Sequence, residues 1–197
     1  DFPPPPGALE AVQKRLDEIK EHKRLALYTA AAGIYDLRKA IADKFKRDNK
    51  IDYTPEEVLV GTGAKQCLYN TMFVLLNQGD EVIVPQPAWP TYPWQIKMCN
   101  GTPVLCETEK ETFNIKADIL RKSVTDKTKA MILTSPCNPS GSVIHKAELK
   151  RITDLALEHD IWIVSDEVYE PFVYDGEEHK STASFSEEVR GRTITIN

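Results

Sequence analysis

The sequence lacks long hydrophobic runs and has no excess of positive charge. Apolar stretches such as 82–84 and 130–133 are short, whereas a membrane-spanning helix needs roughly 20 apolar residues. Its 25 Lys+Arg against 30 Asp+Glu give a net charge of −5, which argues against nucleic acid or an anionic membrane as the main partner. The first residues are acidic and proline-rich, unlike a secretory signal. We therefore expect a cytoplasmic protein.

Paired cysteines and metal-binding clusters are also missing. The four cysteines are widely spaced without a CxxC pair, and the four histidines form no HExxH motif. No GxSxG motif marks a hydrolase serine. Cysteines in or beside apolar segments are typical of free thiols in a reducing cytosol. The sequence thus indicates no metal site, and free thiols are expected at Cys67, Cys99, Cys106 and Cys137.

What is present is a chain of 197 residues, 41% hydrophobic and 28% charged, in which short strand-like runs alternate with helical stretches. This alternation predicts an α/β fold, a mostly parallel sheet with helices on both faces, after an N-terminal helical segment. Strands are predicted at 58–60, 81–84, 103–105, 130–133, 161–164 and 193–196. Helices are predicted at 7–23, 34–49, 68–76, 92–98 and 146–159.

Parallel sheets bind ligands at the carboxyl ends of their strands, and four loops directly follow predicted strands. They are 61–65, 85–89, 135–141 and 165–169. The first, GTGAK, lies between a strand and a helix, where backbone N–H groups and the helix dipole can hold a phosphate. It matches neither the dinucleotide fingerprint nor the P-loop, so a plain tight turn is an equal alternative.

Two further loops carry one suggestive residue each. Trp89 lies among prolines just past a strand, where its indole could cover the face of a flat ligand, although core packing is the commoner role of such a tryptophan. Asn138 could offer an amide N–H to a ligand oxygen. The sequence around it is typical of an ordinary turn, which is the strong alternative, and the ligand role is unspecific.

Asp166 is the most suggestive single residue. It ends an apolar strand, where a buried carboxylate is unfavourable unless it is paired or hydrogen-bonded. Tyr169 follows three residues later and could present its phenol beside the carboxylate. An N-cap or a structural ion pair is the alternative for Asp166. The charges of 177–180 are interpreted as those of a solvated loop.

Taken together and in order, these segments resemble the fold type I, class I/II aminotransferases that depend on pyridoxal 5′-phosphate, of the aspartate or aromatic type. The resemblance extends over nearly the whole chain. The matching segments are 28–38 (YTAAAGIYDLR), 63–66 (GAKQ), 80–82 (DEV), 89–92 (WPTY), 138–141 (NPSG) and 165–169 (SDEVY).

The resemblance implies a role for each loop. Gly63, Ala64 and Lys65 would cradle the cofactor phosphate, and Trp89 would stack on the pyridine ring. A further set of residues would complete the site. Asp166 would pair with the ring nitrogen, Asn138 and Tyr169 would bind the phenolic oxygen, and Tyr28 would reach the phosphate of the neighbouring subunit in a homodimer.

The resemblance also implies what this chain lacks. The family's Schiff-base lysine follows a strand such as 193–196, and the chain stops at Asn197 before it. Lys65 belongs to the phosphate loop, so no catalytic residue is assigned. We expect a piece of a longer polypeptide, inactive alone, whose sheet has unpaired edges or a gap. Residues 1–33 would form an arm and helix of the small domain or dimer contact, and 34–197 the cofactor-binding large domain, truncated at its C-terminal end.

The function expected from the resemblance is transfer of an amino group between an amino acid, of aspartate or aromatic type, and a 2-oxo acid. Two alternatives stay open. A carbon–sulfur β-lyase or a related enzyme shares these loops, because the cofactor permits several outcomes. A non-catalytic binding protein with the same fold is the other.

Overall fold

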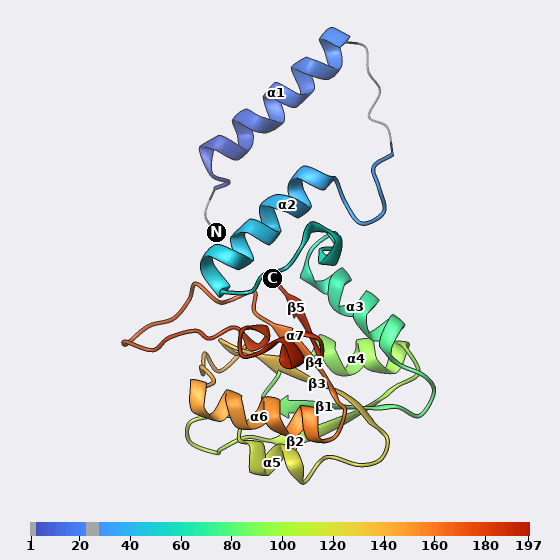
Figure 1. Cartoon of the computed structure of the whole chain (residues 1–197), viewed down its shortest axis with the longest axis vertical. Coiled ribbons are helices and arrows are strands. Elements are labelled where there is room, and N and C mark those ends of the chain that lie inside the picture. The colour runs from blue at the N-terminus through green and yellow to red at the C-terminus, as the bar shows by residue number, and fades with distance from the viewer. Residues whose placement is uncertain (1–2, 23–27) are drawn as a thin grey trace.

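The computed structural model describes residues 3–22 and 28–197. Its centre is a five-stranded sheet in the order β2-β1-β3-β4-β5, in which every neighbouring pair is parallel (Figure 1). The strands are β1 Glu81–Gln86, β2 Thr102–Glu107, β3 Thr128–Thr134, β4 Trp162–Asp166 and β5 Thr193–Ile196. The α-helices are α1 Pro6–His22, α2 Tyr35–Lys44, α3 Ala64–Leu75, α4 Thr91–Met98, α5 Ala117–Arg121, α6 Lys146–Glu158 and α7 Glu187–Arg190. Shorter turns of helix are η1 Phe45–Asn49, η2 Pro55–Glu57 and η3 Thr182–Ser184.

Helices cover both faces of the sheet because successive strand side chains point to opposite faces. Ile83 of β1 belongs to one core cluster, which includes Leu149 and Ile152 of α6. Its neighbour Val82 belongs to the other, which includes Leu68 of α3 and Ile96 of α4. Both sets are almost fully buried. The predicted α/β class and the two-sided helical cover are confirmed.

Most predicted elements form within a few residues of their expected bounds, but the strand predicted at 58–60 is wrong. These residues are irregular, and Val60 N–H donates to the carbonyl of Ala32 at 3.0 Å rather than to a sheet strand. A β-prone run forms a strand only where a neighbouring strand offers its backbone. The phosphate-type loop therefore follows an irregular segment. The short helices α5 and α7 were not predicted.

The sheet itself is continuous among the described residues. Its strands follow one another without a gap, and β2 and β5 each pair on one side only. The expected gap is therefore not seen, while the expected unpaired edges are. No described helix combines the length and the apolar character needed to cross a membrane.

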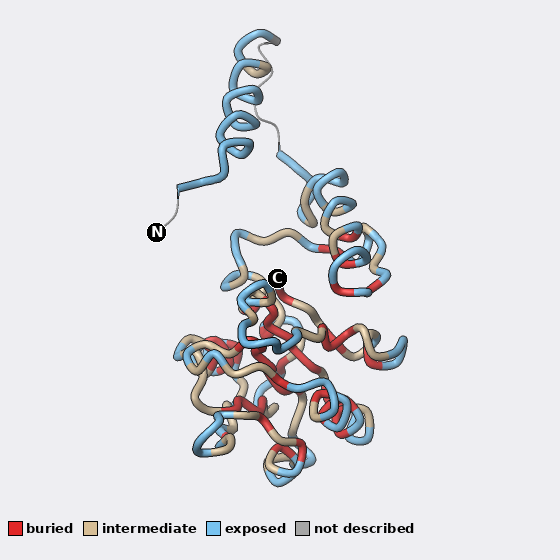
Figure 2. The backbone as a smooth tube through the Cα atoms, turned by 90° about the vertical axis from the view of Figure 1, so that its left-hand side faces the viewer, coloured by how far each residue is buried: buried red, intermediate tan, exposed pale blue. Residues whose placement is uncertain are grey.

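The N-terminal helix α1 differs from the rest of the fold. None of residues 6–21 is buried, and Figure 2 shows α1 as an exposed helix apart from the sheet. The predicted helix end at Lys23 lies outside the described residues, as do Asp1 and Phe2. By contrast, α2 leads into η1, where Phe45 packs with Ile51 and Ala183 in a small third cluster.

Candidate active site

The carboxyl ends of β1, β3 and β4 lead into the walls of one cavity of about 170 Å³. The connection after β1 leads to β2 on one side of it, whereas β3 lies on the other side of β1. This reversal of strand order is a topological switch point, where parallel sheets usually bind ligands. The cavity is lined by Ala64, Lys65, Leu68, Trp89, Tyr92, Asn138, Asp166, Val168 and Tyr169. The structure thus brings together six of the predicted site residues.

The start of α3 forms the anion-binding end of this cavity. Gly63 is the N-cap, with φ +85°, and no side chain caps the helix. The first N–H groups of α3 therefore point out of the helix without an internal partner. The first turn contains no acidic residue, so both the helix dipole and the free N–H groups favour an anion. Gln95 Nε2 donates to the carbonyl of Lys65 at 2.9 Å and ties α4 to this turn.

Trp89 packs against the core and also lines the cavity. Its ring packs edge to face against Tyr92, with ring centroids 5.4 Å apart at 84°, and belongs to the core on the α3 and α4 side. It also lines the cavity, where Lys65 Nζ lies 5.1 Å from the ring centroid. The core contact holds the indole in place as an aromatic wall of the cavity.

Asp166 is buried at the end of β4, with only 4% of its surface exposed. Its Oδ2 accepts a hydrogen bond from Tyr92 Oη at 2.6 Å, and its Oδ1 accepts a longer one from the backbone N–H of Val168 at 3.4 Å. Burial raises the pKa of this carboxyl above its usual range, while the two hydrogen bonds act in the opposite direction. No helix begins at Asp166, and it makes no salt bridge within residues 3–22 and 28–197. The two alternatives considered from the sequence, an N-cap and a structural ion pair, are therefore wrong.

Asn138 and Tyr169 lie together on the same cavity. Asn138 Nδ2 donates to Tyr169 Oη at 3.5 Å, a long bond that leaves both groups able to contact a ligand. Tyr28 is elsewhere. Its side chain is fully exposed and does not line the cavity.

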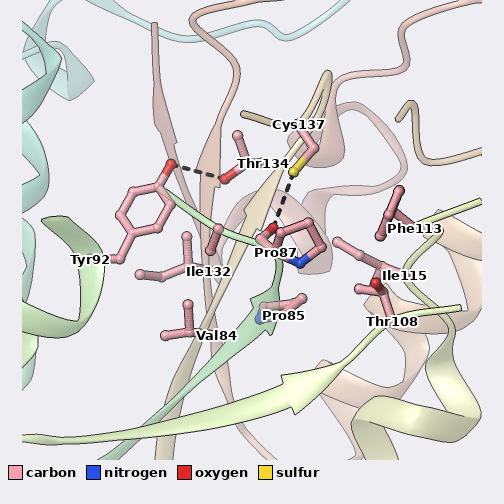
Figure 3. A pocket seen from close by; sticks show the side chains of 11 residues that line it. Val84, Pro85, Pro87, Tyr92, Thr108, Phe113, Ile115, Ile132, Thr134 and Cys137 are labelled. Atoms are coloured by element: carbon pink, nitrogen blue, oxygen red, sulfur yellow. Dashed lines mark hydrogen bonds between the residues drawn. The ribbon is translucent and has the colours of Figure 1, made fainter. Parts of the chain in front are cut away.

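Tyr92 and Thr134 are functional candidates that sequence reasoning missed. Tyr92 Oη lies 2.9 Å from Thr134 Oγ1 (Figure 3). It also donates to Asp166 Oδ2 at 2.6 Å. Figure 3 also shows Cys137 Sγ donating to the carbonyl of Pro87, at 3.5 Å. The available signal was position, since Tyr92 follows Trp89 by only three residues and lies in the first turn of α4.

One further interpretation is corrected by the structure. His179 is not part of a solvated loop, because its side chain is only 11% exposed and its Nε2 lies 3.2 Å from Glu167 Oε2. The cysteines agree better with expectation, since all four are free and two of them, Cys99 and Cys106, are buried.

An uncapped helix N-terminus, an aromatic wall and a buried carboxylate at the carboxyl edge of a parallel sheet define an α/β protein suited to a flat, phosphorylated ligand. The family model for class I and II aminotransferases matches residues 1–196. The chain belongs to this family, whose enzymes depend on pyridoxal phosphate.

Individual relatives agree with this assignment. An aspartate aminotransferase of Bacillus sp. strain YM-2 is 50% identical over 171 residues, covering 86% of this chain and 44% of that protein. One from Bacillus subtilis is 41% identical over 198 residues, covering 100% and 49%. Among solved structures, an aromatic aminotransferase from Pyrococcus horikoshii superposes with a TM-score of 0.93 at 40% identity, covering 99% of this chain and 51% of that one. The chain spans about half the length of the relatives it matches.

Proposed function

We propose that this chain forms the cofactor-binding part of a pyridoxal-phosphate-dependent aminotransferase that moves an amino group between an amino acid, of aspartate or aromatic type, and a 2-oxo acid. The observation that carries the proposal is the buried Asp166 on the same cavity as the uncapped start of α3. When bound, the cofactor supplies an electron-withdrawing pyridine ring that accepts the negative charge developing on the substrate.

The phosphate would lie at the start of α3. Gly63, Ala64 and Lys65 contribute backbone N–H groups there, and the Lys65 ammonium adds a positive charge on the cavity wall. A substituent at Gly61 would meet Cys67 Sγ, only 2.6 Å from the position of an added Cβ. The loop therefore has to approach the helix closely, which keeps these N–H groups in place.

The ring would lie against Trp89, with its nitrogen toward Asp166. A protonated ring nitrogen would provide the positive partner that this buried carboxylate lacks among the described residues. Asn138 and Tyr169 would donate to the ring's phenolic oxygen, since both line the cavity. The donors and the acceptor would thus complement the charge of the cofactor's phosphate, phenolic oxygen and ring nitrogen.

The whole protein is proposed to be a cytoplasmic homodimer. The fully exposed Tyr28, outside the cavity, supports the idea that it reaches the phosphate of the neighbouring subunit. The proposed domain division, an arm of 1–33 and a cofactor-binding domain of 34–197, is supported by the absence of buried residues in 6–21.

The test uses the full-length protein and the variant Asp166→Asn. We expect the wild type to bind pyridoxal phosphate with a visible absorption band and to convert aspartate or an aromatic amino acid with 2-oxoglutarate into glutamate. Asp166→Asn should lose at least about 100-fold in turnover, since it removes a charge-assisted contact to the ring. The matched control Asp175→Asn, at an exposed loop position, should leave both readouts unchanged.

The alternatives give different results. Release of pyruvate and ammonia from cystathionine without glutamate formation would indicate a β-lyase. A full-length protein that binds no pyridoxal phosphate would overturn the proposal and favour a non-catalytic protein of the same fold.

A further inference from the structure

Tyr92 is a buried hydrogen-bonding residue to which the proposed function assigns no role. Only 2% of its surface is exposed, and its hydroxyl lies between Thr134 Oγ1 and Asp166 Oδ2. Thr134 and Asp166 are paired in register at the ends of β3 and β4. The neighbouring strands thus present two polar side chains to one phenol from α4.

The direction of these hydrogen bonds follows from the protons available. A phenol has one proton to donate, and the ionised carboxylate of Asp166 can only accept. Tyr92 therefore donates to Asp166, and its oxygen accepts from the Thr134 hydroxyl. The result is a directed chain from Thr134 through Tyr92 to Asp166. Burial raises the pKa of Tyr92 far above its usual value, so the phenol keeps its proton and stays a donor.

The same side chain also contacts the aromatic wall of the cavity. The Tyr92 ring packs edge to face against Trp89, and its backbone N–H donates to the Trp89 carbonyl at 3.2 Å. One residue therefore touches both groups that are proposed to hold the cofactor ring.

We propose that Tyr92 is a positioning residue, which holds Asp166 through its Oδ2 and leaves Oδ1 to accept the proton-bearing nitrogen of the cofactor ring. Oδ1 is available because its bond from Val168 N–H is long, at 3.4 Å. Thr134 supports this arrangement by donating to the phenol. The inference rests on the proposed function, because it requires a pyridine ring in the cavity.

The experiment measures the binding of two probes to the cofactor-free full-length protein. Pyridoxamine 5′-phosphate has no aldehyde, so its affinity reports non-covalent contacts alone. Its 1-deaza analogue replaces the ring nitrogen by C–H and cannot pair with Asp166. The ratio of the two affinities isolates the contribution of the ring nitrogen. We expect the wild type to prefer pyridoxamine 5′-phosphate and Tyr92→Phe to lower this preference about tenfold, the usual effect of one hydrogen bond to a charged group.

Two further variants separate positioning from packing. Thr134→Val keeps the volume of Thr134 but removes its hydroxyl, and it should lower the preference about two- to threefold. Tyr53→Phe removes a similar tyrosine–threonine contact, Tyr53 Oη to Thr195 Oγ1 at 3.1 Å, outside the cavity. This control should leave the preference unchanged.

The pH dependence of pyridoxamine 5′-phosphate binding gives a second readout. Without its hydrogen bond from Tyr92, Asp166 would protonate at a higher pH, since that bond lowers the pKa of the carboxyl. The loss of binding at acidic pH should therefore begin at a higher pH in Tyr92→Phe than in the wild type. The shift should be smaller in Thr134→Val.

The outcomes distinguish the inference from the proposed function. An equal loss of affinity for both probes, with no shift in the pH at which binding is lost, would overturn the positioning role and leave Tyr92 a packing residue. If Tyr92→Phe fails to fold, an unchanged preference in Thr134→Val has the same meaning. If the wild type and Asp166→Asn bind both probes equally well, the pairing of Asp166 with the ring nitrogen is itself wrong.

Discussion

Asp166 and Glu167 are adjacent in sequence and both buried, yet they lie in opposite environments. Asp166 faces the cavity with one short hydrogen bond and one long one. Glu167 faces away from the cavity and accepts from four donors, namely the hydroxyls of Ser165 and Ser181, the backbone N–H of Thr182 and Nε2 of His179. A carboxylate whose oxygens all accept hydrogen bonds from the protein stabilises the fold. A carboxylate with an oxygen that lacks a short hydrogen bond can accept one from a ligand.

Glu170 gives an intermediate case. Its carboxylate accepts from Lys44 Nζ and from Asn49 Nδ2, and so connects the segment after β4 to α2 and η1. Its oxygens lie close to those of Glu167 and to His179, as in a metal site. Both carboxylates and His179 Nε2 already take part in hydrogen bonds, whereas His179 Nδ1 is buried without a hydrogen-bond partner among the described residues. The difference among the three carboxylates can be measured as stability in the cofactor-free protein.

The largest effect is expected for Glu167→Ala. It leaves several buried donors without an acceptor, at a cost of about 3–5 kcal/mol in the free energy of unfolding. Urea unfolding of the full-length protein measures this loss, with the exposed loop variant Glu178→Gln as the matched control. A loss below about 1 kcal/mol would mean that the Glu167 network contributes little and that the comparison with Asp166 fails.

A smaller loss is expected for Glu170→Gln, about 1–2 kcal/mol at pH 7. Burial alone would raise the pKa of Glu170, but hydrogen bonds from Lys44, Asn49 and Asn197 lower it below its ordinary value of 4.5. A carboxyl whose pKa is lower in the folded state than in the unfolded state stabilises the fold at any pH above its unfolded-state pKa. This contribution disappears as the pH falls through the folded-state pKa. The difference between wild type and variant should therefore shrink below about pH 4.5. A difference that is constant with pH would contradict this account.

The smallest effect, with the opposite sign, is expected for Asp166→Asn without cofactor. Burial raises the pKa of Asp166 above its unfolded value of 3.8. When the pKa of a carboxyl is higher in the folded state than in the unfolded state, its contribution to stability is present at low pH. This contribution is lost as the pH rises through the folded-state pKa. The asparagine, which has no charge to bury, should make the protein slightly more stable at neutral pH and lose this advantage under acidic conditions. Thermal unfolding across pH measures the sign, and destabilisation at neutral pH would disprove it.

Much of the site could be predicted from sequence because its parts follow strands directly. The loops after β1, β3 and β4 contribute Trp89, Asn138 and Asp166 to the cavity, as the parallel-sheet pattern predicts. Tyr92 and Thr134 could not be found in this way. Their contact with Asp166 depends on the register of β3 with β4 and on where α4 packs, and neither is encoded in a local pattern.

Helices α1 and α6 show the same limit for the fold. Both have apolar residues at helical spacing, and both helices were predicted. The apolar face of α6 is buried against the sheet through Leu149, Ile152 and Leu155. In α1, Leu9 and Val12 remain 58% and 59% exposed. Periodicity establishes that a helix is amphipathic, but the packing of other segments decides whether its apolar face is covered.

The sequence by itself determined the α/β class, the position of most helices and strands and the loops that form the cavity, because hydrophobic periodicity and turn residues act over short distances. Only the tertiary structure decided which donors Asp166 and Glu167 each meet, that Tyr92 bonds to Asp166, and that residues 58–60 stay outside the sheet. These outcomes depend on contacts between residues far apart in the chain, and burial sets their energies.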